Sequence, residues 1–326
     1  MLPAIPRDPS LTRDRMSKIR HKISGHFVRA ESSPFAANVH SCERTRGTGN
    51  AGLHLASIHE VRRSQPCEVR TFRDLVGLAG DLCSANFEFN ILFRGQAKED
   101  LDRDGKTRLY PSMYRPHKGG AVVRKKRIAN RYDVLRQVVH LLRNNPDFRP
   151  KRRPLLRHHV VFSALLQHYK ICPTPFLDLT QSLRVAATFA LLRQDSGILY
   201  AVAVPYPHSA LTFSVTDELM LARLTSIAPS NALRPHFQEG YLVGRWPSTR
   251  EKQAEDNIAH RLLGKYRLNN DGGSFWSDEF PAVPTDALLP ETDDFRDQLL
   301  EALRNDKALF DSINCLRTSE GDDELV

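Results

Sequence analysis

The sequence predicts an α+β fold in which helices surround a core of twisted, mostly antiparallel strands. Several segments carry apolar residues at helical spacing, several short apolar runs are typical of buried strands, and no internal repeat is present. A chain of 326 residues is long enough for one large or two small domains. We expect one main domain at residues 69–268, between a basic, weakly ordered extension at 1–68 and an acidic extension with one helix at 269–326.

Five segments are predicted to be helices because their apolar residues recur every three or four positions. They are residues 69–82, 124–145, 154–169, 182–194 and 293–313. Pro154 suits the first turn of the third helix, and Pro146 ends the second. A further basic helix at 13–30 is expected to form only on contact with a partner.

Four segments are predicted to be strands because they are short and rich in apolar or aromatic residues. They are residues 86–95, 197–204, 219–229 and 236–244. The polar segment 96–109 is predicted to be a loop, and so is 173–180, which prolines interrupt.

The charge is distributed unevenly along the chain. The formal net charge is +9. Residues 1–70 carry 12 basic and 6 acidic side chains, 94–170 carry 20 and 6, and 271–326 carry 4 and 15. A basic centre raises the expectation of a polyanionic partner, although solvated helix faces would give the same composition.

Several classes of protein are disfavoured by what the sequence lacks. No apolar run is long enough for a membrane helix, and no secretory signal precedes residue 30. The five cysteines form no CxxC pair, and the histidines have no metal-ligand spacing, so we expect no disulfide framework and no metal site. A cytoplasmic location and no membrane contact are therefore expected.

Arg94 is the first candidate functional residue, because it ends an apolar strand immediately before Gly95. An arginine there is costly to bury unless it meets an anion, and its guanidinium suits a phosphate or a carboxylate. The alternative is a structural pairing with a core acid such as Asp178.

Two further segments contain polar residues suited to a site. Thr174, Asp178 and Thr180 precede an Ala-rich helix, where Asp178 or Thr180 would equally suit a helix N-cap. Gln238 and Glu239 begin a predicted strand. A carboxylate beside an amide can orient a ribose hydroxyl and stabilise developing positive charge, and the alternative is an exposed strand end.

Four segments in order resemble the FRG domain: ILFRGQ, RLYPSMYR, LLQHYKICPTPFLDLTQSLRVAATFA and LRPHFQEGYLVG. The resemblance covers residues 87–246. Lys170, Pro175 and Leu179 stand where the family pattern has Gly, Arg and Trp. The change from Arg to Pro removes a side chain able to contact phosphate.

FRG domains are similar in layout to ADP-ribosyltransferases, and this resemblance implies an ADP-ribosyltransferase-like core with NAD as substrate. It implies that Arg94 and Gly95 hold the pyrophosphate or nicotinamide ribose. Glu239, Gln238 and Arg94 would form the catalytic set, in which Gln238 is the position that matches the family pattern.

The same resemblance implies roles for the remaining candidates. Thr174 or Thr180 would support the nicotinamide pocket, and His168 and Asp178 would support the loop around it. Tyr110 and Tyr114 would stack on nicotinamide or on a target base.

We therefore expect an NAD-dependent ADP-ribosyltransferase, acting as a bacterial toxin or phage-defence effector on nucleic acid, RNA preferred, or on protein. One alternative is a noncatalytic module that binds nucleic acid or nucleotide. Another is an interaction protein whose acidic end docks an antitoxin or chaperone.

Overall fold

The computed structural model describes residues 39–44, 51–115, 123–148, 158–215, 217–245 and 256–318, with side chains from Ala56 onward. Three features of the sequence lie outside the described part of the chain: the predicted basic helix at 13–30, Pro154 with its predicted place in a first helical turn, and the acidic residues 319–326.

The centre of the fold is an eight-stranded sheet in which β3 and β10 are parallel and every other neighbouring pair is antiparallel. The strands, in their order across the sheet, are β3 (Cys67–Val69), β10 (Leu262–Asn269), β6 (Ser196–Val204), β4 (Asn90–Gln96), β5 (Phe176–Thr180), β9 (Gly240–Arg245), β8 (Leu219–Arg223) and β7 (Leu211–Ser214). A separate hairpin joins β1 (Val39–Arg44) and β2 (Ala51–Ala56). The prediction of an α+β fold with a mostly antiparallel sheet is confirmed.

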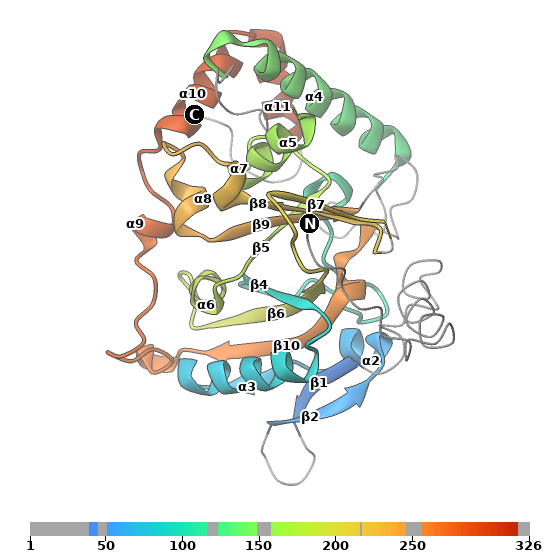
Figure 1. The fold of residues 1–326 in the computed structure, drawn as a ribbon, viewed down its shortest axis with the longest axis vertical. Coiled ribbons are helices and arrows are strands. Elements are labelled where there is room, and N and C mark those ends of the chain that lie inside the picture. The colour runs from blue at the N-terminus through green and yellow to red at the C-terminus, as the bar shows by residue number, and fades with distance from the viewer. Residues whose placement is uncertain are drawn as a thin grey trace, which may run out of the picture.

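Helices lie on both sides of this sheet (Figure 1). They are α2 (Ile58–Arg63), α3 (Phe72–Ala85), α4 (Lys125–Asn144), α5 (His159–His168), α6 (Leu183–Ala190), α7 (Leu224–Ile227), α8 (Leu233–Phe237), α9 (Thr285–Leu288), α10 (Asp294–Arg304) and α11 (Lys307–Thr318). In the figure, α3 lies below β10, whereas α4, α5, α10 and α11 form a layer above the upper strands.

The sheet is weakly joined between β4 and β5. These strands share the single residue pair Phe93–Thr180, whereas β4 pairs with β6 over seven residues and β5 with β9 over five. Alternate residues of β5 enter different cores: Leu177 and Leu179 pack with β6 and α3, and Phe176 packs with α4 and α5. The opening between β4 and β5 positions the candidate site described below.

The prediction of a loop at 173–180 is wrong, because residues 176–180 form the central strand β5. Pro175 immediately precedes the strand, so its missing N–H removes no ladder hydrogen bond. The prolines therefore delimit the strand instead of breaking it.

Two other segments predicted as strands are partly helical. At 219–229 the strand β8 ends at Arg223 and is followed by α7, whose Leu224 and Ile227 are buried at helical spacing. At 236–244 the strand β9 starts only at Gly240 and follows α8. Short apolar runs do not distinguish a strand from one helical turn.

Both flanking regions contribute elements to the fold. The strand β3, which spans the predicted boundary at residues 68 and 69, pairs with β10 in the main sheet. The single helix predicted at 293–313 is two helices, because Asp306 caps α11 by accepting the N–H of Leu309. Phe295 and Leu299 of α10 pack in the same core as α4 and α5.

No helix in the described residues is long and apolar enough to cross a membrane.

Candidate functional site

Arg94 lies on β4 at the edge that faces β5, and it is half-buried. Its Nη1 donates to the main-chain oxygen of Asp178 at 2.7 Å, and its Nε lies 3.4 Å from Oε1 of Gln96. Burial lowers the pKa of Arg94, while the charge of Asp178 opposes this effect. The guanidinium thus contacts the backbone of Asp178 and the side chain of Gln96.

A pocket of about 220 Å³ opens where β4 and β5 separate. Six residues predicted from the sequence line it: Arg94, Gly95, His168, Asp178, Thr180 and Gln238. We call it the anion pocket, because three further cationic or weakly basic side chains, His168, Lys170 and Arg234, line it beside Arg94. Phe93, Val185 and Phe189 supply an apolar wall.

Asp178 is the carboxylate of the anion pocket, and its side chain is 35% exposed. Its Oδ1 lies 3.5 Å from Nδ1 of His168, and its Oδ2 accepts from Nε2 of Gln167 at 2.8 Å. Burial raises the pKa of Asp178, but His168, Arg94 and Gln167 together outweigh burial and hold it below its usual value. The carboxylate is therefore ionised at neutral pH and fixed in orientation.

Gln167 connects Asp178 to a buried polar group behind the pocket. The Oε1 of Gln167 accepts from the hydroxyl of Thr174 at 2.6 Å and from that of Ser112 at 2.9 Å. Thr174 is fully buried and does not line the pocket. It positions the Asp178 carboxylate through Gln167 and does not meet a ligand directly.

Arg234 on α8 lines the anion pocket and was not among the predicted site residues. Its Nε is buried without a hydrogen-bond partner, and the guanidinium makes no ion pair with any described residue. Burial lowers the pKa of Arg234, and the charge of Asp178 opposes this effect. Arg234 lies four residues, one helical turn, before Gln238, and this spacing is the signal in the sequence that could have identified it as a site residue.

Thr180 and Gln238 close the inner end of the pocket through hydrogen bonds within the protein. The Thr180 hydroxyl donates to the main-chain oxygen of Gln238 at 2.7 Å, and Nε2 of Gln238 donates to that of Leu288 at 2.6 Å. Both side chains are buried. These contacts hold α8 against β5 and thereby place Arg234.

Besides Thr174, three predicted residues are not brought to the pocket. The Glu239 side chain is exposed and does not line it. Tyr114 is 1% exposed, and its hydroxyl lies 2.5 Å from that of Tyr132. Tyr110 is near Arg62 and Arg108, away from the pocket residues.

Gly95 has a packing role beside the pocket. A Cβ at this position would lie 1.8 Å from the main-chain oxygen of Ala186 in α6, and one at Gly197 of β6 would lie 2.0 Å from that of Ala190. These two glycines let α6 approach both strands closely.

Lys170 follows α5 with a positive φ of 53°, in the conformation that glycine favours. The N–H of Ile171 donates to the oxygen of Leu166, and that of Lys170 donates to the oxygen of Gln167, both at 2.9 Å. This is a Schellman motif. The position therefore keeps the backbone that the glycine of the family pattern would adopt, although Lys occupies it.

We expect Lys170→Gly to raise the free energy of unfolding by about 0.5–1 kcal/mol, because relief of the left-handed conformation exceeds the added entropy of the unfolded chain. Urea denaturation measures the change. Lys170→Ala removes the same side chain but keeps the strain, so it should bring no gain. A larger gain for Ala than for Gly would contradict this explanation.

We expect stability to fall as the pH is lowered from 7 to 4. Burial lowers the pKa of His168, and burial with the nearby cations Arg62, His59 and Lys106 lowers that of His260 to about 4. In the unfolded chain these two histidines are protonated near pH 6.5. The stability gained by the folded protein while they are neutral is therefore fully present above that pH and is lost as the pH falls below it. One pKa unit corresponds to about 1.4 kcal/mol, so the lowered pKa of His260 makes the loss about 3 kcal/mol by pH 4.

Urea denaturation between pH 7 and pH 4 tests this expectation. His260→Gln should flatten the dependence, because its side chain cannot be protonated. An equal dependence in the variant and the wild type would assign the effect to other groups.

Among the described residues, no three His, Cys, Asp or Glu side chains lie close enough together to hold a metal ion.

Comparison with known proteins supports one of the predicted resemblances. No curated protein matches the chain, and no solved structure matches it. A family model does match, and its range runs from the residue before β4 to the second residue of β6. It therefore contains Arg94, His168, Asp178 and Thr180 but not Arg234 or Gln238. Residues 89–197 match the model of the FRG domain, which confirms the predicted resemblance over the first three motifs, whereas the fourth motif, at 233–244, lies beyond the match.

Proposed function

We propose that the chain is an NAD-dependent ADP-ribosyltransferase whose reaction occurs in the anion pocket. The observation that supports the proposal most is the combination of two guanidiniums, Arg94 and Arg234, with the ionised Asp178 in one pocket. Guanidiniums bind pyrophosphate through paired hydrogen bonds. A carboxylate nearby stabilises the positive charge that develops on a ribose when its bond to nicotinamide breaks.

The size of the pocket limits which part of NAD it encloses. Ligand pockets for whole drug-sized molecules measure about 300–1,000 Å³. At about 220 Å³, the anion pocket suits the pyrophosphate and one ribose, with the remainder of NAD in the open mouth. The apolar wall of Val185 and Phe189 suits the nicotinamide ring.

The chemistry requires little acid catalysis. The bond between ribose C1′ and the nicotinamide nitrogen breaks with its electron pair moving to the cationic ring, which leaves as neutral nicotinamide. Asp178 stabilises the positive charge that develops on the ribose. The acceptor then attacks C1′, and its proton passes to Asp178 or to water.

This assignment differs from the one that the family resemblance implies for Glu239. The exposed Glu239 side chain lies outside the pocket, whereas Asp178 lines it. We therefore propose Asp178 as the carboxylate that acts on the ribose.

Incubation of the purified protein with labelled NAD and a cell extract tests the activity. We expect release of nicotinamide and transfer of label to RNA, DNA or protein, and we expect Arg94→Ala to abolish both. Intact NAD together with unlabelled macromolecules would overturn the proposal.

Arg234→Gln is expected to weaken binding of ADP-ribose by about tenfold, because it removes a guanidinium that no described residue pairs. Isothermal titration calorimetry measures the affinity. Arg184→Gln, on the exposed face of α6, is the matched control and should leave the affinity unchanged. Equal losses in both variants would indicate a general charge effect instead of a contact in the pocket.

A noncatalytic nucleotide-binding module is the second candidate. It is favoured by the position of Glu239, whose side chain lies outside the pocket. Asp178 is then the only carboxylate among the described residues that line the pocket. This candidate predicts that ADP-ribose binds while NAD stays intact.

A further inference from the structure

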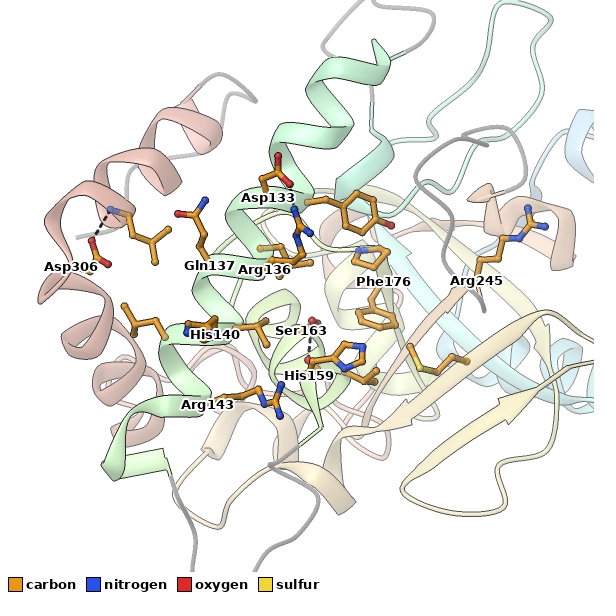
Figure 2. Close-up of a pocket in the computed structure, with 18 residues that line it drawn as sticks. Asp133, Arg136, Gln137, His140, Arg143, His159, Ser163, Phe176, Arg245 and Asp306 are labelled. Carbon is orange, nitrogen blue, oxygen red and sulfur yellow. Dashed lines mark hydrogen bonds and ion pairs between the residues drawn. The ribbon is translucent and has the colours of Figure 1, made fainter.

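A second and larger pocket, of about 1,030 Å³, opens between α4 and α5 (Figure 2). It lies at the opposite end of β5 from the anion pocket: Phe176 lines the larger pocket, whereas Asp178 and Thr180, on the same face of the strand, line the smaller one. The two pockets likewise flank α5, with His159 at one end and His168 at the other. We call the larger one the α4–α5 pocket.

One wall of this pocket is a basic stripe on α4. Arg136, His140 and Arg143 are four and three residues apart, so they follow one face of the helix over about 10 Å. Figure 2 shows all three on the side of α4 that faces His159 and Ser163 of α5. Arg136 pairs with Asp133, whereas Arg143 makes no ion pair or hydrogen bond with a described residue.

The floor of the α4–α5 pocket is apolar. Val139 of α4, Val160 of α5, Phe176 of β5 and Met220 of β8 contribute to it. An apolar floor beside a cationic wall fits a ligand that has a flat apolar part attached to anionic groups. A nucleotide has this composition.

The α4 wall of the pocket belongs to a strongly basic helix. The α4 helix carries six basic residues and one acidic residue. Such a density of charge attracts a polymer of phosphates more strongly than a single anion.

We propose that the α4–α5 pocket binds single-stranded nucleic acid, with phosphates along Arg136, His140 and Arg143 and an unstacked base on the apolar floor. A single strand fits better than a duplex, because only unpaired bases are free to enter a concave pocket. The proposal goes beyond the activity assigned to the anion pocket and does not depend on cleavage of NAD.

Fluorescence anisotropy with a labelled 12-nucleotide RNA, without NAD, tests the proposal between 50 and 200 mM KCl. Single strands lose affinity with a logarithmic slope of about 0.7 for each phosphate contact. We expect the double variant Arg136→Gln, Arg143→Gln to bind about tenfold more weakly at 50 mM KCl and to lower the slope by about 1.4. An RNA of equal length without bases and a duplex should each bind more weakly than the single strand.

The matched control is the double variant Arg63→Gln, Arg70→Gln. It changes the net charge equally, at exposed positions on α2 and before α3, away from α4 in Figure 1. Its affinity should remain within twofold of the wild type. Equal losses in both double variants, an unchanged slope in the α4 variant, or equally tight binding of the baseless RNA would overturn the proposal.

Asp178→Asn separates this inference from the proposed activity. It should leave RNA affinity unchanged, because Asp178 lines only the anion pocket. Loss of RNA binding in Asp178→Asn equal to that in the α4 variant would place the RNA in the anion pocket and overturn the inference.

Discussion

Asp178→Asn is expected to slow the release of nicotinamide from NAD by about 100- to 1,000-fold. The substitution removes the negative charge that faces the ribose but preserves the size of the side chain. Because Arg94 and Arg234 remain, we expect KM for NAD to change much less than kcat. The measurement is steady-state kinetics of nicotinamide release.

The decisive comparison is with Glu239→Gln. This variant removes a carboxylate that the sequence made a catalytic candidate but whose exposed side chain does not line the pocket. Its rate should stay within about threefold of the wild type. A loss of rate in Glu239→Gln with normal activity in Asp178→Asn would reverse the assignment, and denaturation curves of both variants would exclude unfolding as the cause.

Gly95→Ala is expected to destabilise the protein by about 3 kcal/mol or more, enough to prevent folding in a protein of ordinary stability. The added methyl group would lie 1.8 Å from the oxygen of Ala186 and 2.6 Å from the nitrogen of Ala190. Both are backbone atoms of α6, so no side-chain rotation relieves the contact. The measurement is the yield of folded protein together with urea denaturation.

Gly77→Ala is the matched control for this prediction. Gly77 lies on α3, and a Cβ there would meet no atom within 4 Å. Its helix propensity should improve, with a gain of about 0.5–1 kcal/mol. A Gly95→Ala protein whose free energy of unfolding stayed within 1 kcal/mol of the wild type would show that α6 can move away from β4.

This prediction also separates two roles of the Phe-Arg-Gly sequence. Gly95 lines the anion pocket, yet its space is filled by the backbone of α6. Arg94, one residue earlier, directs its guanidinium toward Asp178. Neighbouring strand residues face opposite ways, so Phe-Arg-Gly combines a packing position with a binding position.

The long helices and the buried strands could be predicted from the sequence because their signals are local. The helical spacing of apolar residues located α3 and α4, and the continuous apolar run located β6. The segment 173–180 could not be assigned in this way. Its prolines indicate a loop, whereas pairing with both β4 and β9 makes residues 176–180 a strand.

The candidate site was predictable in part. Arg94 stood out because an arginine at the end of an apolar strand requires a reason to be buried. Asp178 and Gln238 stood out as polar residues before an Ala-rich helix and at the start of a predicted strand. Arg234 did not stand out, since arginine on a short amphipathic segment is usually solvated. Its role depends on α8 being held against β5 by the hydrogen bond between Thr180 and Gln238.

The sequence by itself determined the α+β class, the uneven charge and the match to the FRG domain, because these depend on composition and on motifs of neighbouring residues. Only the tertiary structure decided that Asp178 and Arg234 line the anion pocket while Glu239 lies outside it. The physical reason is that a side chain's direction depends on strand register and backbone conformation. The positive φ of 46° at Glu239, immediately before β9, shows how far that conformation departs from the extended strand that the sequence predicts there.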